Sequence, residues 1–513
     1  MPPTSFPPAA ASRLPVDAVV FAMNALVEPA TPEPGQTPRA VPGVRRLIVA
    51  LARAGLSPRA LAPRASAPGD REQHLAACGA HLTAAGLGPE VVAVIDADAT
   101  LPGTTRARTL AVTRCPEMAA GLAQASHPVV VLEDRAVAPA VHAWFADRLG
   151  AFGAACLMVG PLDDLAAADT VARHLRLTKP PGSLGRLEQI GAHLAAIAGD
   201  SPPPVPRPAA TAVFAGDHGV HAQGVSPWPQ EVTAQMVANF LAGGAAVNVL
   251  AAQAGAGVVV VDVGVAGDLP APDAAQADGD DGDGTALLRR RVRAGTSDLA
   301  TGPAMTVEDA RRALDVGAEV AVLLVAGGAR CLVTGDMGIG NTTPAAALVA
   351  TFTDRPASAV TGRGTGIDDQ LLTRKTALVA AATARARYLH PGDPIGLLAE
   401  VGGLEHAALA GFVIAGAALQ VPVVVDGLIA GAALLVASRL VPGVERCVVA
   451  GHRSSEPGAS AVLDELDLEP VLDLDLRLGE GTGALLALPL VEAAARVVHD
   501  MATFDQAGVT DKS

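Results

Sequence analysis

Short apolar runs alternate with helical stretches along the chain. Between residues 16 and 161, the runs DAVVFAM, VVAVIDA and PVVVLED are separated by amphipathic stretches such as VRRLIVALARAG. This alternation is typical of strands that are joined by crossover helices in a parallel sheet. It starts again near Asp163 and continues to about Val509. The pattern predicts a disordered tail at 1–15, a smaller α/β domain at 16–161 and a larger α/β domain at 162–509.

Several apolar runs of the second domain end in glycines and polar residues. They are TAVFAGDHG, VVVVDVG, CLVTGDMGIGNTT, VPVVVDG and RCVVAGHRSSE. Ligands of open parallel sheets bind beyond the carboxyl ends of the strands, where these polar residues would meet. Any one of them could be merely structural. Together they predict one site, with the candidates Asp217, His218, Asp262, Asp336, Asp426, His452 and Glu456.

Two glycine-rich segments are candidates for holding a phosphate. In GDMGIGNTTP the glycines let backbone N–H groups converge ahead of a capped helix, and the residues concerned are Gly335, Gly338, Gly340, Asn341, Thr342 and Thr343. The segment GRGTGID (362–368) precedes a helix with Arg374 and Lys375, either of which could contact the same phosphate. The alternatives are an ordinary strand-turn-helix connection and a solvated lysine.

Glu480 lies between Gly479 and Gly481 in the segment RLGEGTG. Flanking glycines permit close approach of a ligand, so this carboxylate could act as a general base. The alternative is a turn-forming glutamate at the surface. The charged residues just before it could satisfy one another: Asp473, Asp475 and Arg477.

The segment from residue 216 to 250 offers groups that could hold a flat heteroaromatic base. It contains the hydroxyl of Ser226, the ring of Trp228 and the amide of Gln235. His218 and His221 resemble a metal pair by spacing, but no clear third ligand accompanies them. We therefore predict neither a metal ion nor a cofactor.

Charge and composition narrow the classes of partner. The formal net charge is −15 and the isoelectric point is near 5.2, so the chain lacks the cationic character with which proteins bind nucleic acid. The most apolar region, 407–444, is interrupted by Gln420, Pro422, Asp426 and Arg439. It predicts a buried helix, strand and helix rather than a membrane span.

The cysteines and the N-terminus indicate the compartment. Five scattered cysteines form neither a C-x-x-C pair nor a disulfide framework. The first residues, MPPTSFPPAAASRLP, lack the basic start and apolar core of a secretory signal. We expect a cytoplasmic protein.

Taken together, the segments of the second domain resemble the nicotinate-nucleotide-dimethylbenzimidazole phosphoribosyltransferase family, which prepares the lower ligand of cobalamin. The resemblance begins with LTKPPGSLGRLE and continues through GDHGV, EVTAQMVANFLAGGAAVNVL, GTSDLATGPAMT, GDMGIGNTT and GRGTGID. It then runs through VVVDG, GHRSSE, RLGEGTGAL and DMATFDQAGV. It implies a Rossmann-like parallel-sheet transferase domain with added helices, and a homodimer.

The resemblance also implies a reaction and roles for residues. The phosphoribosyl group of nicotinate mononucleotide would pass to 5,6-dimethylbenzimidazole, giving α-ribazole 5′-phosphate and nicotinate. Glu480 would be the base and Asp336 a second catalytic carboxylate, although the family usually has glutamate where this chain has Asp336. The expected substrate contacts are Ser226, Gln235, Gly338, Gly340, Asn341, Thr342, Gly364, Lys375, Asp426 and Arg477.

The first domain resembles haloacid-dehalogenase-like (HAD-like) domains. VDAVVFAMNALV stands where that family has VDAVVFDLDGVL, so Ala22 replaces the nucleophilic aspartate and Asn24 the acid/base aspartate, although Glu133 and Asp134 persist. We expect a degenerate domain kept for stability, association or regulation. Two alternatives are a phosphatase acting on the product of the second domain, and a whole chain that binds nucleotide or base without catalysis.

Overall fold

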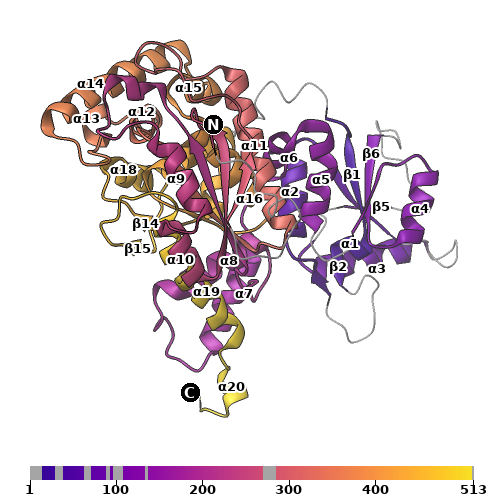
Figure 1. The fold of residues 1–513 in the computed structure, drawn as a ribbon. Coiled ribbons are helices and arrows are strands. Elements are labelled where there is room, and N and C mark those ends of the chain that lie inside the picture. The colour runs from indigo at the N-terminus through magenta and orange to yellow at the C-terminus, as the bar shows by residue number, and fades with distance from the viewer. Residues whose placement is uncertain are drawn as a thin grey trace.

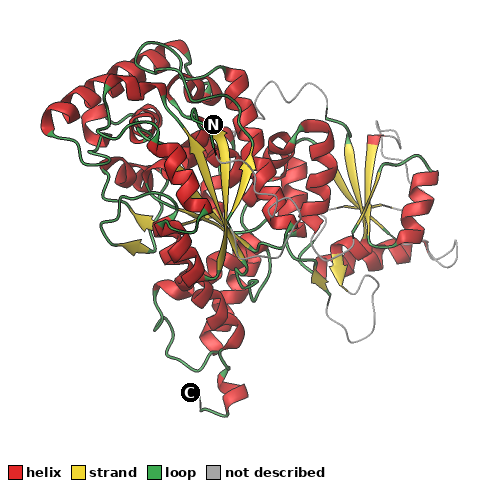
Figure 2. Ribbon diagram, viewed as in Figure 1, coloured by secondary structure: helices red, strands yellow, loops and turns green. Residues whose placement is uncertain are grey.

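The computed structural model describes residues 14–28, 38–62, 71–87, 93–95, 108–132, 137–269 and 285–510. It contains two separate parallel sheets, each between layers of helices (Figures 1 and 2). The prediction of an α/β protein with parallel sheets is therefore confirmed. The predicted tail lies almost entirely outside the described residues, as do Glu133 and Asp134.

The first part of the chain forms a five-stranded sheet in the order β5-β4-β1-β6-β7. All neighbouring strands in it are parallel. Its elements are β1 (Ala18–Ala22), α1 (Met23–Leu26), β2 (Val27–Glu28), β3 (Arg39–Ala40), α2 (Val44–Arg53), β4 (Ser57–Leu61), α3 (Arg71–Ala84), β5 (Ala93–Ile95), β6 (Thr109–Thr113), α4 (Pro116–Gln124), β7 (Val129–Val131), α5 (Val137–Leu149) and α6 (Ala151–Met158).

The second part forms a six-stranded parallel sheet in the order β10-β9-β8-β11-β12-β13. Its strands are β8 (Ala209–Gly216), β9 (Ala256–Gly264), β10 (Ala286–Arg289), β11 (Cys331–Met337), β12 (Val423–Val425) and β13 (Val448–Ala450). A small pair of strands lies beside it, β14 (His452–Arg453) and β15 (Leu472–Asp473).

Helices cover both faces of the larger sheet. The helices of this part are α7 (Asp164–Arg176), α8 (Arg186–Ala198), α9 (Val232–Leu241), α10 (Ala246–Ala254), α11 (Val307–Ala326), α12 (Thr342–Thr353), α13 (Ala357–Val360), α14 (Asp369–Leu389), α15 (Pro394–Val401), α16 (Leu404–Ala418), α17 (Leu428–Leu440), α18 (Pro457–Glu465), α19 (Thr482–Asp500) and α20 (Phe504–Ala507). Two short 3-10 helices are also present (Gly219–Gln223 and Val444–Cys447).

Alternate side chains of each central strand enter two different cores. Leu332 packs into the core under α16 and α17, whereas its neighbours Cys331 and Val333 pack into the core under α9, α10 and α19. Successive side chains of a strand point to opposite faces, so a strand that is covered on both sides is apolar throughout. This burial leaves the ends of the strands as the part of the sheet that a ligand can reach.

The apolar region 407–444 folds as predicted. It forms the buried helix α16, the strand β12 and the buried helix α17. By length and composition alone, two other stretches within the described residues could cross a membrane, Val232–Ala254 and Thr482–Asp500. The first is divided into α9 and α10, and the second packs against α8 and α10. Both therefore have the character of helices in a globular fold.

The two parts are packed against each other through a continuous core. Helix α6 contacts α11 and α16 (Figure 1). Arg46 of α2 is 1% exposed. Its guanidinium donates to the carbonyls of Gly160, Pro161 and Ile197 and to Cys447 Sγ. An arginine of the first part of the chain is thus held by hydrogen bonds to the second part, at Ile197 and Cys447.

Candidate active site

The polar residues predicted to share one end of the sheet do lie there. Asp217 directly follows β8, Asp336 lies near the end of β11, and Asp426 directly follows β12. His452 follows β13 after one residue. All four are at most 5% exposed. The strand-end pattern of the sequence therefore located this group of residues.

Glu480 is held over the sheet in an unusual backbone conformation. Its φ is +63°, and the φ angles of Gly479 and Gly481 are +81° and +92°. A non-glycine residue in the left-handed region is uncommon and marks a turn that the surrounding structure imposes. A Cβ on Gly335 of β11 would lie only 2.7 Å from the Glu480 carbonyl oxygen, so the turn rests directly on the strand.

The Glu480 carboxylate is 6% exposed and meets the start of α10. The backbone N–H of Val247 donates to Glu480 Oε2 over 3.3 Å. Burial raises the pKa of this carboxyl, the Val247 N–H opposes the rise, and the negative charge of Asp426 adds to it. A carboxylate with a raised pKa is a better proton acceptor than an ordinary one, so the site fits a general base.

Asp426 supports the Glu480 turn from below. Its oxygens accept hydrogen bonds from the N–H groups of Gly481 (3.3 Å) and Ala484 (3.0 Å) at the start of α19. His452 Nδ1 lies 3.4 Å from Asp426 Oδ1, an ion-pair distance that lacks hydrogen-bond geometry. Asp426 is thus engaged with the protein on both oxygens, and its predicted contact with substrate stays a prediction.

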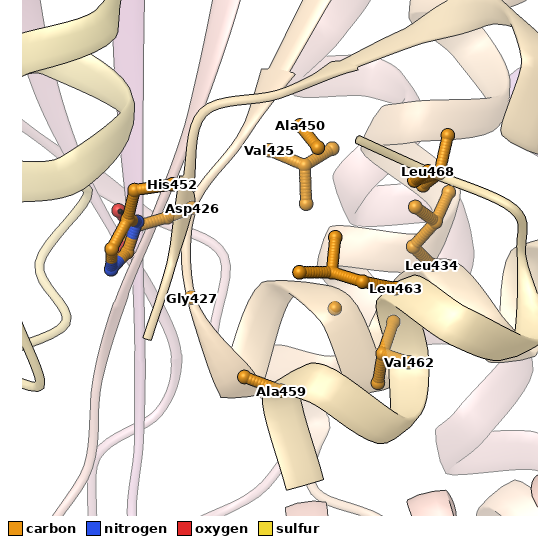
Figure 3. Close-up of a pocket in the computed structure, with 11 residues that line it drawn as sticks. Val425, Asp426, Gly427, Leu434, Ala450, His452, Ala459, Val462, Leu463 and Leu468 are labelled. Carbon is orange, nitrogen blue, oxygen red and sulfur yellow. Dashed lines mark ion pairs between the residues drawn. The ribbon is translucent and has the colours of Figure 1, made fainter. Parts of the chain in front are cut away.

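A small cavity lies next to Asp426 and His452. Figure 3 shows these two side chains together on one side of the cavity, with Leu434, Val462 and Leu463 on the other. Its volume is about 20 Å³, which is room for about one water molecule. The cavity is too small for a substrate. A larger cavity of about 650 Å³ lies beside the edge strand β13 and is lined by residues of α8 and α18.

Asp336 lies beside the Glu480 turn. A Cβ on Gly479 would be 3.1 Å from Asp336 Oδ2. The same oxygen accepts a hydrogen bond from Asn341 Nδ2 over 2.9 Å. Asn341 occupies the N-cap position of α12 without capping it through its side chain. The prediction that the Asn341 side chain caps α12 is therefore wrong, because its amide contacts the carboxyl group of Asp336 instead.

The loop that follows β11 passes over a buried group of charges. A Cβ on Gly338 would lie 2.3 Å from the Gly216 carbonyl oxygen and 3.1 Å from His218 Nε2, so only glycine fits there. Glu405 Oε1 is 3.0 Å from His218 Nε2 and 2.7 Å from His406 Nδ1, and all three side chains are at most 1% exposed. These contacts are ion pairs by distance but not well-aligned hydrogen bonds.

Glu405 and His406 were not among the residues predicted from the sequence. They open α16 within a long apolar run, LEHAALAGFVIAGAA. Burial lowers the pKa of His218, but the charges of Glu405 and Asp217 raise it by more, so the pKa lies above its ordinary value. Burial raises the pKa of Glu405, but the charges of His218 and His406 lower it by more, so the pKa lies below its ordinary value. Two ionisable residues in an otherwise apolar helix were the signal that could have identified the pair.

The two glycine-rich segments meet, as a joint phosphate site requires. Lys375 Nζ donates to Thr342 Oγ1 (2.8 Å), which belongs to the first segment, and to the Gly362 carbonyl (3.1 Å), which belongs to the second. Gly364 has a φ of +53°, and a Cβ there would lie 2.8 Å from Thr342 Oγ1. Gly340, with a φ of +89°, also needs to be glycine. Phosphate binding at this junction stays a prediction.

Two further side chains hold the second glycine segment in place. Glu456 Oε1 accepts from the Gly364 N–H over 2.8 Å, and Arg477 Nη1 donates to the Gly364 carbonyl over 2.9 Å. Asp473 lies 3.4 Å from Arg453. The prediction that Asp473, Asp475 and Arg477 pair with one another is therefore wrong for two of them. Arg477 contacts Gly364, and Asp473 pairs with Arg453.

The other strand-end carboxylates hold loops. Asp217 Oδ2 accepts from the Ala266 N–H over 2.8 Å, and Asp262 accepts from the Val265 N–H and from Arg291 Nε. Both residues are about 1 to 2% exposed. Their role is to hold the backbone at Val265 and Ala266 and the side chain of Arg291 at this end of the sheet.

The residues predicted for the base pocket are more exposed. Ser226 Oγ accepts a local hydrogen bond from the Trp228 N–H over 3.2 Å. Gln235 lies on the exposed side of α9, while Thr233 of the same helix contacts the Ile339 N–H over 3.1 Å. Helix α9 is thus anchored to the first glycine segment. The base-binding roles of Ser226 and Gln235 stay predictions.

The two histidines that resembled a metal pair have separate partners. His218 faces Glu405, whereas His221 Nε2 contacts the Trp228 carbonyl over 2.8 Å. Among the residues that the structure describes, no group of three histidine, cysteine or acidic side chains is arranged to hold a metal ion.

Lys375 gives the site a pH-dependent charge. Burial lowers the pKa of Lys375 to about 8, against a smaller opposing effect of Glu456. The amine is therefore charged below pH 8. Because its folded pKa lies below the ordinary value, the folded protein binds fewer protons than the unfolded chain between pH 8 and 10.5, and stability from this group rises with pH in that window.

If Lys375 binds a phosphate, kcat/KM for a phosphorylated substrate is expected to fall about tenfold between pH 7 and pH 9. In Lys375→Arg the charge persists, so the profile over this range should be flat, though lower overall because arginine does not reproduce the lysine geometry. Steady-state rates at saturating second substrate provide the measurement. If kcat/KM of Lys375→Arg still fell between pH 7 and pH 9 as in the natural chain, Lys375 would be excluded as the cause of the fall.

The second part of the chain is similar to known phosphoribosyltransferases. A family model described as "Phosphoribosyltransferase" matches residues 159–509. The chain is 56% identical over 359 residues to a nicotinate-nucleotide-dimethylbenzimidazole phosphoribosyltransferase of Salinispora tropica, covering 69% of this chain and 98% of the relative. A protein of the same name from Thermus thermophilus is 52% identical over 336 residues, covering 65% of this chain and 95% of that one.

A solved structure extends the comparison to the fold. The crystal structure of the phosphoribosyltransferase from Thermus thermophilus aligns with a TM-score of 0.63 and 49% identity. The alignment covers 68% of this chain and all of that one. The chain therefore belongs to the nicotinate-nucleotide-dimethylbenzimidazole phosphoribosyltransferase family.

Proposed function

We propose that this chain transfers the phosphoribosyl group of nicotinate mononucleotide to 5,6-dimethylbenzimidazole, in the synthesis of the cobalamin lower ligand. The products are α-ribazole 5′-phosphate and nicotinate. The observation that supports this most directly is the Glu480 turn, which holds a buried carboxylate with a raised pKa next to Asp336. The activity for which the relatives are named favours an enzyme over a non-catalytic binding protein.

In the proposed reaction, a ring nitrogen of the benzimidazole attacks the anomeric carbon of the nucleotide. The new nitrogen–carbon bond forms as the bond to the nicotinate nitrogen breaks, and the electron pair of that bond leaves with nicotinate. The proton of the azole N–H passes to the Glu480 carboxylate. The junction of Thr342, Lys375 and Gly364 would hold the 5′-phosphate through backbone N–H groups and one cation.

The test is release of nicotinate from nicotinate mononucleotide by the purified full chain, with and without 5,6-dimethylbenzimidazole. We expect release that depends on the base and is matched mole for mole by α-ribazole 5′-phosphate. A chain that binds both compounds but releases no nicotinate would support the non-catalytic alternative.

We propose, in addition, that the first part of the chain is a HAD-like domain without phosphatase chemistry. The parallel order β5-β4-β1-β6-β7 is consistent with such a domain. The end of β1 offers Ala22 rather than a carboxylate, and the Asn24 Oδ1 atom is near the Thr113 hydroxyl (3.4 Å) and the Arg114 N–H (3.2 Å). Phosphate release from α-ribazole 5′-phosphate in excess magnesium would contradict this proposal.

We also propose a cytoplasmic homodimer. All five cysteines are free thiols, which suits a reducing compartment. Large apolar side chains of the transferase part are exposed, including Trp228 at 52%, Val249 at 62% and Leu478 at 60%. Such residues are common at protein interfaces. Sedimentation of the purified chain distinguishes one 51.2 kDa protomer from two.

A further inference from the structure

At the buried end of the larger sheet, beside Asp217 and Asp262, lie four carboxyl groups that interact with one another electrostatically. Asp336, Asp426, Glu405 and Glu480 are 5%, 5%, 0% and 6% exposed. The charges of the other three all act on Asp336. Several buried carboxylates close together cannot all be ionised unless each has a compensating partner, because removing an ion from water is costly.

Three of the four carboxyl groups have partners that favour the charged form. Glu405 lies between the two imidazoles of His218 and His406. Asp426 accepts two backbone N–H groups at the start of α19 and faces His452. Glu480 meets the N-terminal end of α10, where the helix dipole favours negative charge. Each therefore has a histidine or backbone N–H partner that favours its charged form, although burial still leaves the pKa values of Asp426 and Glu480 raised.

Asp336 is the exception. Among the described residues, the side-chain donor to its carboxyl group is the neutral amide of Asn341, at 2.9 Å. The amine of Lys375 is directed to Thr342 and Gly362 instead. Burial raises the pKa of Asp336 well above its ordinary value, the charges of Asp426, Glu405 and Glu480 raise it further, and the Asn341 hydrogen bond opposes them.

We propose that Asp336 carries a proton in the free protein and releases it to solvent when nicotinate mononucleotide binds. The proposal rests on the proposed function, because it needs a ligand with a cationic ring beside the anomeric carbon. The pyridinium charge supplies the compensation that Asp336 lacks in the free protein. The O–H bond of the carboxyl group breaks, the proton passes to buffer, and a carboxylate remains beside the carbon at which positive charge develops.

The arrangement would also serve the base. While Asp336 holds the proton, Glu480 can remain ionised without a second negative charge next to it. Once the cationic nucleotide is bound, both carboxylates can be charged together. The nucleotide would thereby prepare the site for attack by the benzimidazole.

The experiment is calorimetric titration of the full chain with nicotinate mononucleotide at pH 7 in two buffers of different ionisation enthalpy. The difference in heat gives the number of protons released. We expect the natural chain to release about one proton more per nucleotide than Asp336→Asn, whose amide mimics the neutral acid. Ribose 5-phosphate, which has the phosphate but no cationic ring, should release about one proton fewer than the nucleotide from the natural chain.

The ribose 5-phosphate comparison uses unmodified protein, so it decides the question even if Asp336→Asn fails to fold. Proton exchange by the phosphate and by Lys375 is common to both ligands and cancels in the comparison. Saturable nucleotide binding without proton release, or equal release by both ligands, would overturn the proposal and leave the proposed function intact. No saturable nucleotide binding, together with no nicotinate release, would overturn both.

Discussion

Replacing Glu480 by glutamine is expected to lower kcat for base-dependent nicotinate release about a thousandfold, within the range for loss of a general base. Glutamine keeps the size of the side chain and can still accept the Val247 N–H that Glu480 Oε2 accepts over 3.3 Å. It cannot take the proton of the azole. The loss should therefore fall on kcat, with little change in the binding of nicotinate mononucleotide.

The pH profile provides a second readout for Glu480. Only the ionised form accepts a proton, so activity should fall as the pH drops through the raised pKa of Glu480. This acid limb should vanish from the residual activity of Glu480→Gln. Circular dichroism and thermal unfolding of the variant serve as the folding control. A folded Glu480→Gln with near-natural kcat would exclude Glu480 as the proton acceptor.

The strand-end residues could be predicted because a parallel sheet constrains them strongly. An apolar run that is followed by glycine and a polar group predicts a buried strand. It also indicates the end of that strand at which ligands bind. Asp336, Asp426 and His452 were located in this way. The separate role of each residue could not be predicted, because it depends on contacts between residues far apart in the sequence. An example is the pair of hydrogen bonds that the N–H groups of Gly481 and Ala484 donate to Asp426.

The features that were not predicted also depend on contacts between distant parts of the chain. β4 has the sequence SPRAL, which contains a proline and no apolar run, yet it pairs with both β1 and β5. Its strand conformation is imposed by its neighbours in the sheet. Glu405 and His406 were missed because the hydrophobic pattern of α16 describes only its burial. Their pairing with His218 depends on the approach of α16 to the end of β8.

The contact between the two parts predicts the largest effect on stability. Arg46→Met is expected to lower the free energy of unfolding by about 3 kcal/mol, because three buried carbonyls lose their donor. The carbonyls belong to Gly160, Pro161 and Ile197, two in the connection that follows α6 and one at the end of α8. Methionine fills much of the same volume, so the change reports chiefly the lost hydrogen bonds.

The adjacent residue, Arg45, provides a matched control for Arg46. Its side chain is 32% exposed and lies 3.6 Å from Asp163, so Arg45→Met should cost less than about 1 kcal/mol. Urea unfolding of both variants, followed by circular dichroism and by nicotinate release, measures the difference. Because Arg46 joins the first part of the chain to the connection at Gly160 and Pro161 and to the end of α8, the two signals should shift together to lower urea in Arg46→Met. Loss of the circular dichroism signal at lower urea while nicotinate release stayed at its natural midpoint would instead mean that the first part of the chain unfolds on its own.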